Sequence, residues 1–243
     1  MEILVTTAEE LAKSAVTHFW QVREAQATKQ KKSGKIDQGF RGSVTGGAQM
    51  DGFIGAFREL AHMAGLPDDA VFTKRRFLEL PGYFRPTKEW DLLIVYEGVL
   101  LAAIEAKSQV GPSFGNNFNN RTEEAMGSAL DLWIAFREKA YKRTIRPWLG
   151  YMFLLEDCPQ SQRPVRVREP HFEVFPEFRE ASYAKRYEVF CKKLVLERHY
   201  DATAFLLSKR DGGLRGLYSE PCGDIGFYRF ANSLVSHLKG YKP

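Results

Sequence analysis

The chain has 243 residues, and a hydrophobic content of 44% with 27% charged residues is typical of a globular protein with a sizeable core. Its 35 Lys and Arg residues outnumber its 30 Asp and Glu residues, so the net charge of +5 permits a polyanionic partner without requiring one. Three widely spaced cysteines argue against a disulfide framework or a zinc site, and there is no signal pattern and no apolar run long enough for a membrane span. We therefore expect a cytoplasmic protein that does not enter a membrane.

The first fifty residues favour a helix followed by a connector. A capping-box pattern of Thr7 with Glu10 predicts the start of the first helix. Residues 29–49 are basic and rich in glycine, and we interpret them as a flexible connector. A second helix is then predicted to end at Gly65, with an apolar face formed by Phe53, Ile54, Phe57, Leu60, Ala61 and Ala64.

The middle of the chain favours strands. Residues 71–80 are predicted to form a strand, and residues 91–108 a hairpin with its turn at Gly98. The polar segment 111–121 follows as a predicted loop, and a helix is predicted over 122–142.

The remaining elements alternate in type. The apolar run 148–156 predicts a buried strand, and residues 157–181, rich in Pro and Arg, predict a long loop. A helix over 182–199, a strand over 202–208 and a helix over 225–239 are predicted after it. The order α-β-β-β-α-β with added helices predicts an α/β fold: a mixed sheet with helices on both faces.

The predicted hairpin brings three charged residues to one place. If Tyr96 pairs with Leu100, Asp91 falls opposite Glu105, with Cβ atoms about 4.5–5.5 Å apart. Side chains alternate along a strand, so Glu105 and Lys107 share a face. Two carboxylates this close repel each other unless a cation lies between them. The pattern indicates a divalent-metal site, because Mg²⁺ takes one or two carboxylates together with water and phosphate oxygens.

A metal at this place would suit phosphodiester hydrolysis, with Lys107 orienting the attacking water or stabilising the developing negative charge. Spacing alone leaves an alternative open, because many hairpins match D-x13-E-x-K by chance. In that alternative Asp91 caps the strand, and Glu105 and Lys107 form a surface ion pair.

Five blocks around these residues carry a family resemblance. They are "MDGF" (50–53), "LPGYFRPTKEWD" (80–91), "EAKSQVGPSFGNNFNNRTEEAMG" (105–127), "LLEDC" (154–158) and "ASYAKRYEV" (181–189). With these blocks the chain resembles the XhoI-type restriction endonucleases of the PD-(D/E)xK nuclease superfamily. The stretch "VGPSFGNNFNNR" is more specific than the D…ExK pattern. One departure is Trp90, which occupies the place where the superfamily name puts proline.

The resemblance implies a type II enzyme that cuts double-stranded DNA at a short palindrome, CTCGAG for the XhoI type, and leaves 5′-phosphate ends. It implies that Asp91, Glu105 and Lys107 are catalytic. Mg²⁺ would be held by the two carboxylates and the backbone carbonyl of Ala106. Two symmetric cuts imply a homodimer, and the resemblance alone implies a cognate DNA methyltransferase in the host. We expect residues 1–243 to form a single nuclease domain, with an N-terminal helix and connector (1–49), a catalytic core (50–156), and a long loop with helix-strand-helix (157–243).

The resemblance also raises the question of an accessory acid, because this superfamily often places one on the helix before the sheet. Asp51 and Glu59 are the candidates, although we favour the interpretation in which Asp51 caps this helix and Glu59 is solvated.

Recognition of the bases requires other side chains, because Arg typically contacts guanine and Asn contacts adenine. The segment 111–121 leaves the predicted active strand directly, and the loop 157–181 carries alternating arginines. We also expect at least half of the asparagines to brace the loop's own backbone through Asx-turns. The DNA-binding candidates are Asn116, Asn117, Asn119, Asn120, Arg121, Arg163, Arg166 and Arg168.

Other functions remain open from the sequence. They are a structure-selective or repair nuclease of the same superfamily, a sequence-specific DNA-binding protein without catalysis, and an unrelated α/β protein with a chance hairpin match. The intact Asp91, Glu105 and Lys107 argue against the loss of catalysis.

Overall fold

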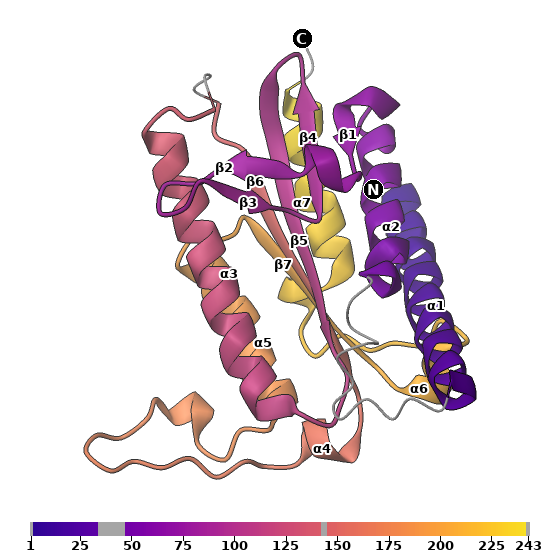
Figure 1. The fold of residues 1–243 in the computed structure, drawn as a ribbon, viewed down its shortest axis with the longest axis vertical. Coiled ribbons are helices and arrows are strands. Elements are labelled where there is room, and N and C mark those ends of the chain that lie inside the picture. The colour runs from indigo at the N-terminus through magenta and orange to yellow at the C-terminus, as the bar shows by residue number, and fades with distance from the viewer. Residues whose placement is uncertain (1, 34–46, 142–144, 242–243) are drawn as a thin grey trace.

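The computed structural model describes residues 2–33, 47–141 and 145–241. A five-stranded sheet in the order β1-β4-β5-β6-β7 forms the centre, and a two-stranded β2-β3 hairpin crosses in front of it (Figure 1). The strands are β1 (Val71–Phe72), β2 (Glu79–Pro81), β3 (Thr87–Glu89), β4 (Leu92–Tyr96), β5 (Val99–Gln109), β6 (Trp148–Glu156) and β7 (Ala202–Ser208).

Helices cover both faces of the sheet, as the sequence predicts (Figure 1). Within the described ranges, none of these helices has the length and apolar character needed to cross a membrane. The α-helices are α1 (Glu2–Ser33), α2 (Asp51–Met63), α3 (Phe114–Arg137), α4 (Pro159–Gln162), α5 (Tyr183–Leu196), α6 (Arg210–Gly213) and α7 (Phe227–Gly240). Short 3₁₀ helices lie at Ala48–Met50, Asp68–Ala70, Arg75–Phe77, Pro176–Phe178 and Gly223–Ile225.

The sheet is mixed and separates two hydrophobic cores. Strands β1, β4 and β5 are antiparallel, whereas β5, β6 and β7 run parallel through crossovers that contain α3 and α5. One core lies between the sheet and α1, α2 and α7, and the other lies between the sheet and α3 and α5. Strands β6 and β7 are buried along almost their whole length and are mostly apolar, because both of their faces are covered.

The β4–β5 hairpin differs from the predicted register at its turn and agrees with it near the charged residues. Glu97 and Gly98 both have positive φ angles, 49° and 74°, so the turn has two residues and Tyr96 pairs with Val99 rather than with Leu100. A β-bulge between Ile94 and Val95 then shifts the pairing by one residue. Leu92 therefore pairs with Ile104, which is the register that was predicted for this end of the hairpin.

Three predictions for the N-terminal half are wrong in whole or in part. The first helix begins at Glu2, so Thr7 lies inside α1 and does not begin it, and residues 29–33 continue that helix. Residues 34–46 of the predicted connector lie outside the described residues, and Ala48 and Gln49 at its end belong to the 3₁₀ helix Ala48–Met50. The predicted strand 71–80 is interrupted, because a 3₁₀ helix at Arg75–Phe77 separates β1 from β2.

The predicted loop 111–121 is also wrong, because α3 begins at Phe114 and contains all four asparagines. Two aromatic contacts hold this end of the helix against α5. Phe114 stacks on Tyr183 with ring centroids 5.8 Å apart, and Phe118 meets the Tyr187 ring edge-on at 4.9 Å. An aromatic pair four residues apart gives the polar segment an apolar helical face, and packing of this face outweighs the low helix propensity of asparagine.

A buried carboxylate on α3 holds the β2–β3 hairpin in place. Asp131 Oδ1 accepts hydrogen bonds from the backbone N–H groups of Tyr83 (2.7 Å) and Phe84 (2.8 Å). Asp131 Oδ2 accepts a hydrogen bond from Arg85 Nε at 2.8 Å. Burial would raise the pKa of Asp131, but the N–H of Phe84, the Arg85 guanidinium and the N–H of Tyr83 outweigh it and lower the pKa.

We expect Asp131→Ala to reduce the free energy of unfolding by about 1–3 kcal/mol at pH 7, because it removes the acceptor for three donors at once. The pKa of Asp131 is lowered in the folded state, so its stabilising effect is present above the unfolded value of about 4 and is lost as the pH falls below it. Urea unfolding at pH 7 and at about pH 3 measures this effect. The exposed Asp69→Ala is the control, and an equal loss in both variants at pH 7 would contradict the role of Asp131.

Candidate active site

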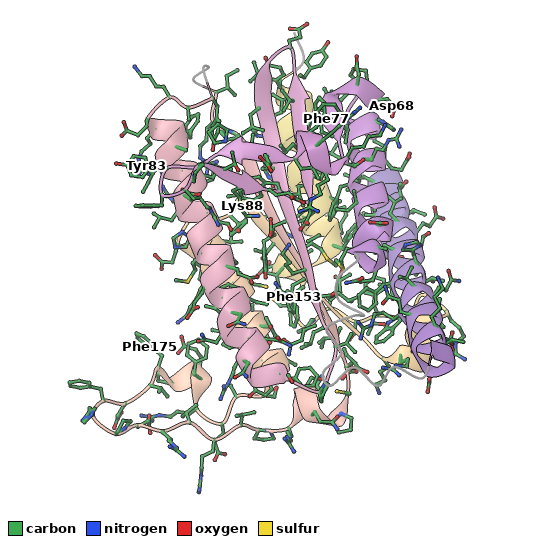
Figure 2. All side chains as sticks on the ribbon, in the orientation of Figure 1. Asp68, Phe77, Tyr83, Lys88, Phe153 and Phe175 are labelled. Atoms are coloured by element: carbon green, nitrogen blue, oxygen red, sulfur yellow. The ribbon has the colours of Figure 1, made fainter. Side chains whose placement is uncertain are left out.

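The predicted charged cluster forms at the open end of the β4–β5 hairpin. Asp91 directly precedes β4, while Glu105 and Lys107 lie two residues apart on β5 and face the side of the sheet that α3 covers. Lys88 joins them from β3, and Figure 2 shows it in the middle of the molecule between α3 and the sheet. Two adjacent strands and a short hairpin thus supply all four side chains.

Lys107 connects the two acidic side chains. Its Nζ donates hydrogen bonds to Asp91 Oδ2 at 2.9 Å and to Glu105 Oε1 at 2.7 Å. The backbone N–H of Ala106 also donates to Asp91 Oδ2, at 2.8 Å. On the other side of Glu105, Lys88 Nζ donates to Oε2 at 3.0 Å. The convergence of Asp91, Glu105 and Lys107 is therefore as the sequence predicts, and Lys88 is an addition.

Burial and charge give the two carboxylates opposite pKa shifts. The Glu105 side chain is only 7% exposed, and burial would raise its pKa, but Lys107 and Lys88 together lower it. The pKa of Asp91 is raised, by burial first and then by the negative charge of Glu105. Burial would lower the pKa of Lys107, yet Glu105 and Asp91 raise it, so the ammonium form is favoured.

The donor set fits a magnesium ion. Asp91 and Glu105 each place an oxygen within hydrogen-bonding distance of one nitrogen atom, so both carboxylates face a common point. In the part of the chain that the structure describes, no group of three or more His, Cys, Asp or Glu residues is arranged to hold a metal ion. Two carboxylates with room for water and phosphate oxygens are nevertheless what Mg²⁺ usually takes from a protein.

Two cavities meet at this cluster. One, of about 490 Å³, lies between β3, β5 and α3, and Lys88, Glu105, Lys107 and Arg121 are among its lining residues. The other, of about 700 Å³, lies between α2 and the strand ends, and Asp91 lines it. A long substrate could therefore approach the cluster from both sides.

The structure treats the two candidate accessory acids differently. Asp51 lines the same cavity as Asp91, and burial raises its pKa although His18 counteracts this shift. Asp51 is the first residue of α2, and the N-cap position belongs to Met50, so the favoured interpretation of Asp51 as the cap is wrong. Glu59 is 61% exposed and lies 4.0 Å from His62 Nδ1, away from the lining of that cavity, as expected for a solvated residue.

The asparagine segment lies on the first turns of α3, beside the cluster. Arg121 lines the 490 Å³ cavity and forms an ion pair of 2.5 Å with Glu124. Asn119 Nδ2 donates to Glu123 Oε1 at 2.8 Å. Among the residues described, the side chains of Asn116, Asn117 and Asn120 make no hydrogen bond, so the predicted bracing of a loop backbone is wrong.

The arginine candidates of the long loop lie on the segment between α4 and α5, which runs past the end of the molecule where α3 begins (Figure 1). Arg163, Arg166 and Arg168 are exposed and form no ion pair with any described residue. Arg186 on α5 donates to the carbonyl oxygen of Val165 at 3.0 Å and thereby fixes the base of this segment.

Lys88 was not predicted because residues 81–90 were not assigned to a strand. The spacing in "TKEWD" indicates only that Lys88 and Trp90 lie on the same face of an extended segment. It does not indicate that this face meets Glu105 on β5. Trp90 itself is buried in the core under α3, and Lys88 Nζ lies 4.8 Å from its ring centroid.

We predict that Asp91→Asn leaves the protein at least as heat-stable as the wild type at pH 7 in a chelating buffer. The pKa of Asp91 is higher in the folded than in the unfolded protein, so the stability that Asp91 contributes at low pH is lost as the pH rises through this pKa. At neutral pH the ionised Asp91 therefore lowers the free energy of unfolding. Asparagine removes that charge and keeps an acceptor for the Ala106 N–H. Calorimetry should show a melting temperature unchanged or raised by about 1–3 °C. A clear decrease, with no decrease in Asp69→Asn, would contradict the charge assignment.

Comparisons with known proteins agree on one family. The family model described as "Restriction endonuclease XhoI" matches residues 29–220. The type II restriction enzyme BstVI of Geobacillus stearothermophilus is 59% identical over 211 residues, which cover 85% of this chain and 93% of that protein. The type II restriction enzyme XhoI of Xanthomonas vasicola is 47% identical over 190 residues, which cover 78% of this chain and 76% of that protein. No solved structure is significantly similar to the chain. On the family match and these identities, the chain belongs to the XhoI restriction endonuclease family.

Proposed function

We propose that the protein is a type II site-specific deoxyribonuclease that uses Mg²⁺ to cut double-stranded DNA at a short palindrome, with CTCGAG as the candidate site. The observation that carries this proposal is the arrangement of Asp91, Lys107 and Glu105 between two cavities in a chain of this family. The named relatives are type II restriction enzymes, which supports the reaction class.

We propose that the fold is the PD-(D/E)xK nuclease core. The order α2, β1, β4, β5, α3, β6 supports this, because it repeats the expected α-β-β-β-α-β order once the β2–β3 hairpin is set aside. The expectation of a single nuclease domain over residues 1–243 remains a proposal. It is supported by the two cores, which share one sheet.

Each residue of the cluster has a distinct role in the proposed reaction. Asp91, Glu105 and the backbone carbonyl of Ala106 would hold Mg²⁺, which supplies charge neutralisation at the phosphate and a lowered pKa of a bound water. The charged Lys107 ammonium group already contacts both carboxylates, so it can orient the attacking water beside them. It can also hydrogen-bond a phosphate oxygen as negative charge develops there. In-line attack of the water on phosphorus would leave 5′-phosphate and 3′-hydroxyl ends.

Recognition of the site is proposed for the start of α3 and the segment between α4 and α5. Three amides without a side-chain partner among the described residues, at Asn116, Asn117 and Asn120, can each present a donor and an acceptor to a base edge. Arg121 is closer to the cluster and suits the phosphate beside the cut. Asn119 is paired with Glu123, and it is the weakest candidate of the segment. Arg163, Arg166 and Arg168 are proposed as further DNA contacts because they are exposed and free of ion pairs among the described residues.

The proposal includes three wider features. A palindromic site cut on both strands requires two active sites related by a two-fold axis, so the active form is a homodimer. A cognate DNA methyltransferase would protect the host's own sites. A cytoplasmic location agrees with three unpaired cysteines, which are usual in a reducing compartment.

Lys107→Ala is expected to reduce cleavage of plasmid DNA by about 100-fold or more, because it removes a donor aimed at the reacting phosphate. Specific binding of a duplex should remain measurable. The control is Lys239→Ala on α7, an exposed lysine on the other side of the sheet, which should cut as the wild type does. Gel analysis of the fragments measures the rate, and undiminished cutting by Lys107→Ala would disprove the active-site assignment.

A further inference from the structure

Lys88 is held in a defined position although it lies on a short hairpin. Its side chain is 16% exposed, its ammonium group lies against the buried Trp90 ring, and Lys88 pairs with Leu80 across the hairpin. The hairpin is tied to α3 through Asp131, and the Trp90 N–H donates to the carbonyl of Leu78 at 2.9 Å, which extends the pairing of β2 with β3. The next residue, Asp91, donates its N–H to the carbonyl of Ile104 on β5 at 3.2 Å and so joins this segment to the sheet. These contacts fix the strand that carries Lys88, so little conformational freedom is left to lose when it binds another group.

Each oxygen of the Glu105 carboxylate is bound by a different lysine. Oε1 accepts from Lys107 at 2.7 Å and Oε2 accepts from Lys88 at 3.0 Å. One lysine is enough to separate Asp91 from Glu105, so the second positive charge is not needed for that purpose. With Asp91 and Lys107 included, the cluster carries two negative and two positive charges and is neutral as it stands. A divalent cation on the two carboxylates would give it an excess of two positive charges, which favours an anion beside them.

The open side of Lys88 faces the cavity in which such an anion would lie. Lys88, Glu105 and Lys107 line the same cavity of about 490 Å³, and Arg85 and Arg121 line it as well. Four cationic and four acidic side chains thus line this cavity, the acids being Glu89, Glu105, Glu123 and Glu124. Arg85 is paired with Asp131 and Arg121 with Glu124, so the two lysines beside Glu105 are the cations that a metal on Glu105 would release. A DNA phosphate suits two lysines released in this way, because ammonium groups are among its usual partners.

We propose that Lys88 is a second active-site lysine, which leaves Glu105 Oε2 and donates a hydrogen bond to a non-bridging oxygen of the DNA backbone at or beside the cut phosphate. This inference rests on the proposed function, since it names a further substrate contact of the same site. Lys107 and Lys88 then approach the phosphate from opposite sides of Glu105. The position of Lys88 over Trp90 keeps its ammonium group at the cavity wall in the absence of DNA.

The rival explanation is that Lys88 only neutralises a buried carboxylate. A buried ion pair of that kind affects folding when one partner is removed, but it does not change the number of phosphates that the protein contacts. The two explanations therefore differ in the salt dependence of DNA binding. The logarithm of the binding constant falls with the logarithm of the salt concentration by about 0.9 for each phosphate neutralised on duplex DNA.

The test measures duplex binding in Mg²⁺ at several salt concentrations with hydrolysis blocked by Lys107→Ala. In this background we expect Lys88→Gln to weaken binding about tenfold at low salt and to reduce the slope by about one phosphate contact. Lys88→Arg keeps the charge and should retain the slope. Lys239→Gln, on the far side of the sheet, is the matched control. Unchanged affinity and slope in Lys88→Gln would overturn the inference.

A second readout protects the test against a folding defect. In enzyme that retains Lys107, the single-turnover rate of cleavage should fall about 10- to 100-fold in Lys88→Gln. In Lys88→Arg most of the wild-type rate should remain. If Lys88→Gln does not fold, Lys88→Met replaces it as the uncharged variant. The same assays then compare Lys88→Met with Lys88→Arg, and equal rates and equal salt slopes in the two variants would overturn the inference. A wild type that cuts no duplex would disprove the proposed function itself. A wild type that cuts, with Lys88→Gln equally fast and equally salt-sensitive, would disprove only the role of Lys88.

Discussion

The ammonium group of Lys107 between the carboxylates of Asp91 and Glu105 is the interaction on which the rest of the site depends. Without a cation at this position, two acids on adjacent strands would repel each other in surroundings where water screens them poorly. Lys107 offsets this repulsion and is itself kept charged by the two acids. Because Lys107 is only two residues from Glu105 on one strand, the backbone sets the distance between them. The price is an Asp91 whose ionised form is disfavoured by its surroundings, as is common where a site must bind a cation.

The architecture around this cluster serves to hold strands at fixed distances. Apolar layers on both faces of the sheet fix β4 and β5, and the bulge between Ile94 and Val95 sets their register where it matters for Asp91. The β2–β3 hairpin has few residues of its own and depends on Asp131 of α3 for its position. Helix α3 therefore has two functions: its middle fixes the hairpin that carries Lys88, and its beginning carries the candidate DNA contacts. A change in α3 packing should influence both the chemistry and the recognition of the site.

Sequence reasoning located the cluster because its signals are local. An apolar run on both sides of a glycine turn, with acids and a lysine at alternating positions, predicts that Asp91, Glu105 and Lys107 meet, although the predicted turn is one residue too long. No sequence pattern indicates the β-bulge between Ile94 and Val95. This bulge compensates for a turn that is one residue shorter than expected. The composition of the asparagine segment favours a loop, although Phe114 and Phe118 are four residues apart, as on one face of a helix. That spacing indicates a helix only once the aromatic residues of α5 that cover this face are known. The contact of Lys88 with Glu105 joins β3 to β5, and a pairing between separate strands of this kind has no local signal in the sequence.

Sequencing the DNA ends that the protein forms would test whether this cluster performs the proposed Mg²⁺-dependent cleavage at a defined DNA sequence. The protein would be incubated with a mixture of long duplexes in Mg²⁺, in parallel with a sample in chelator, and all new ends would be sequenced. We predict 5′-phosphate ends at one short palindrome, cut symmetrically on both strands and only when Mg²⁺ is present. Ends scattered without a common sequence, or ends formed equally in the chelator, would contradict it.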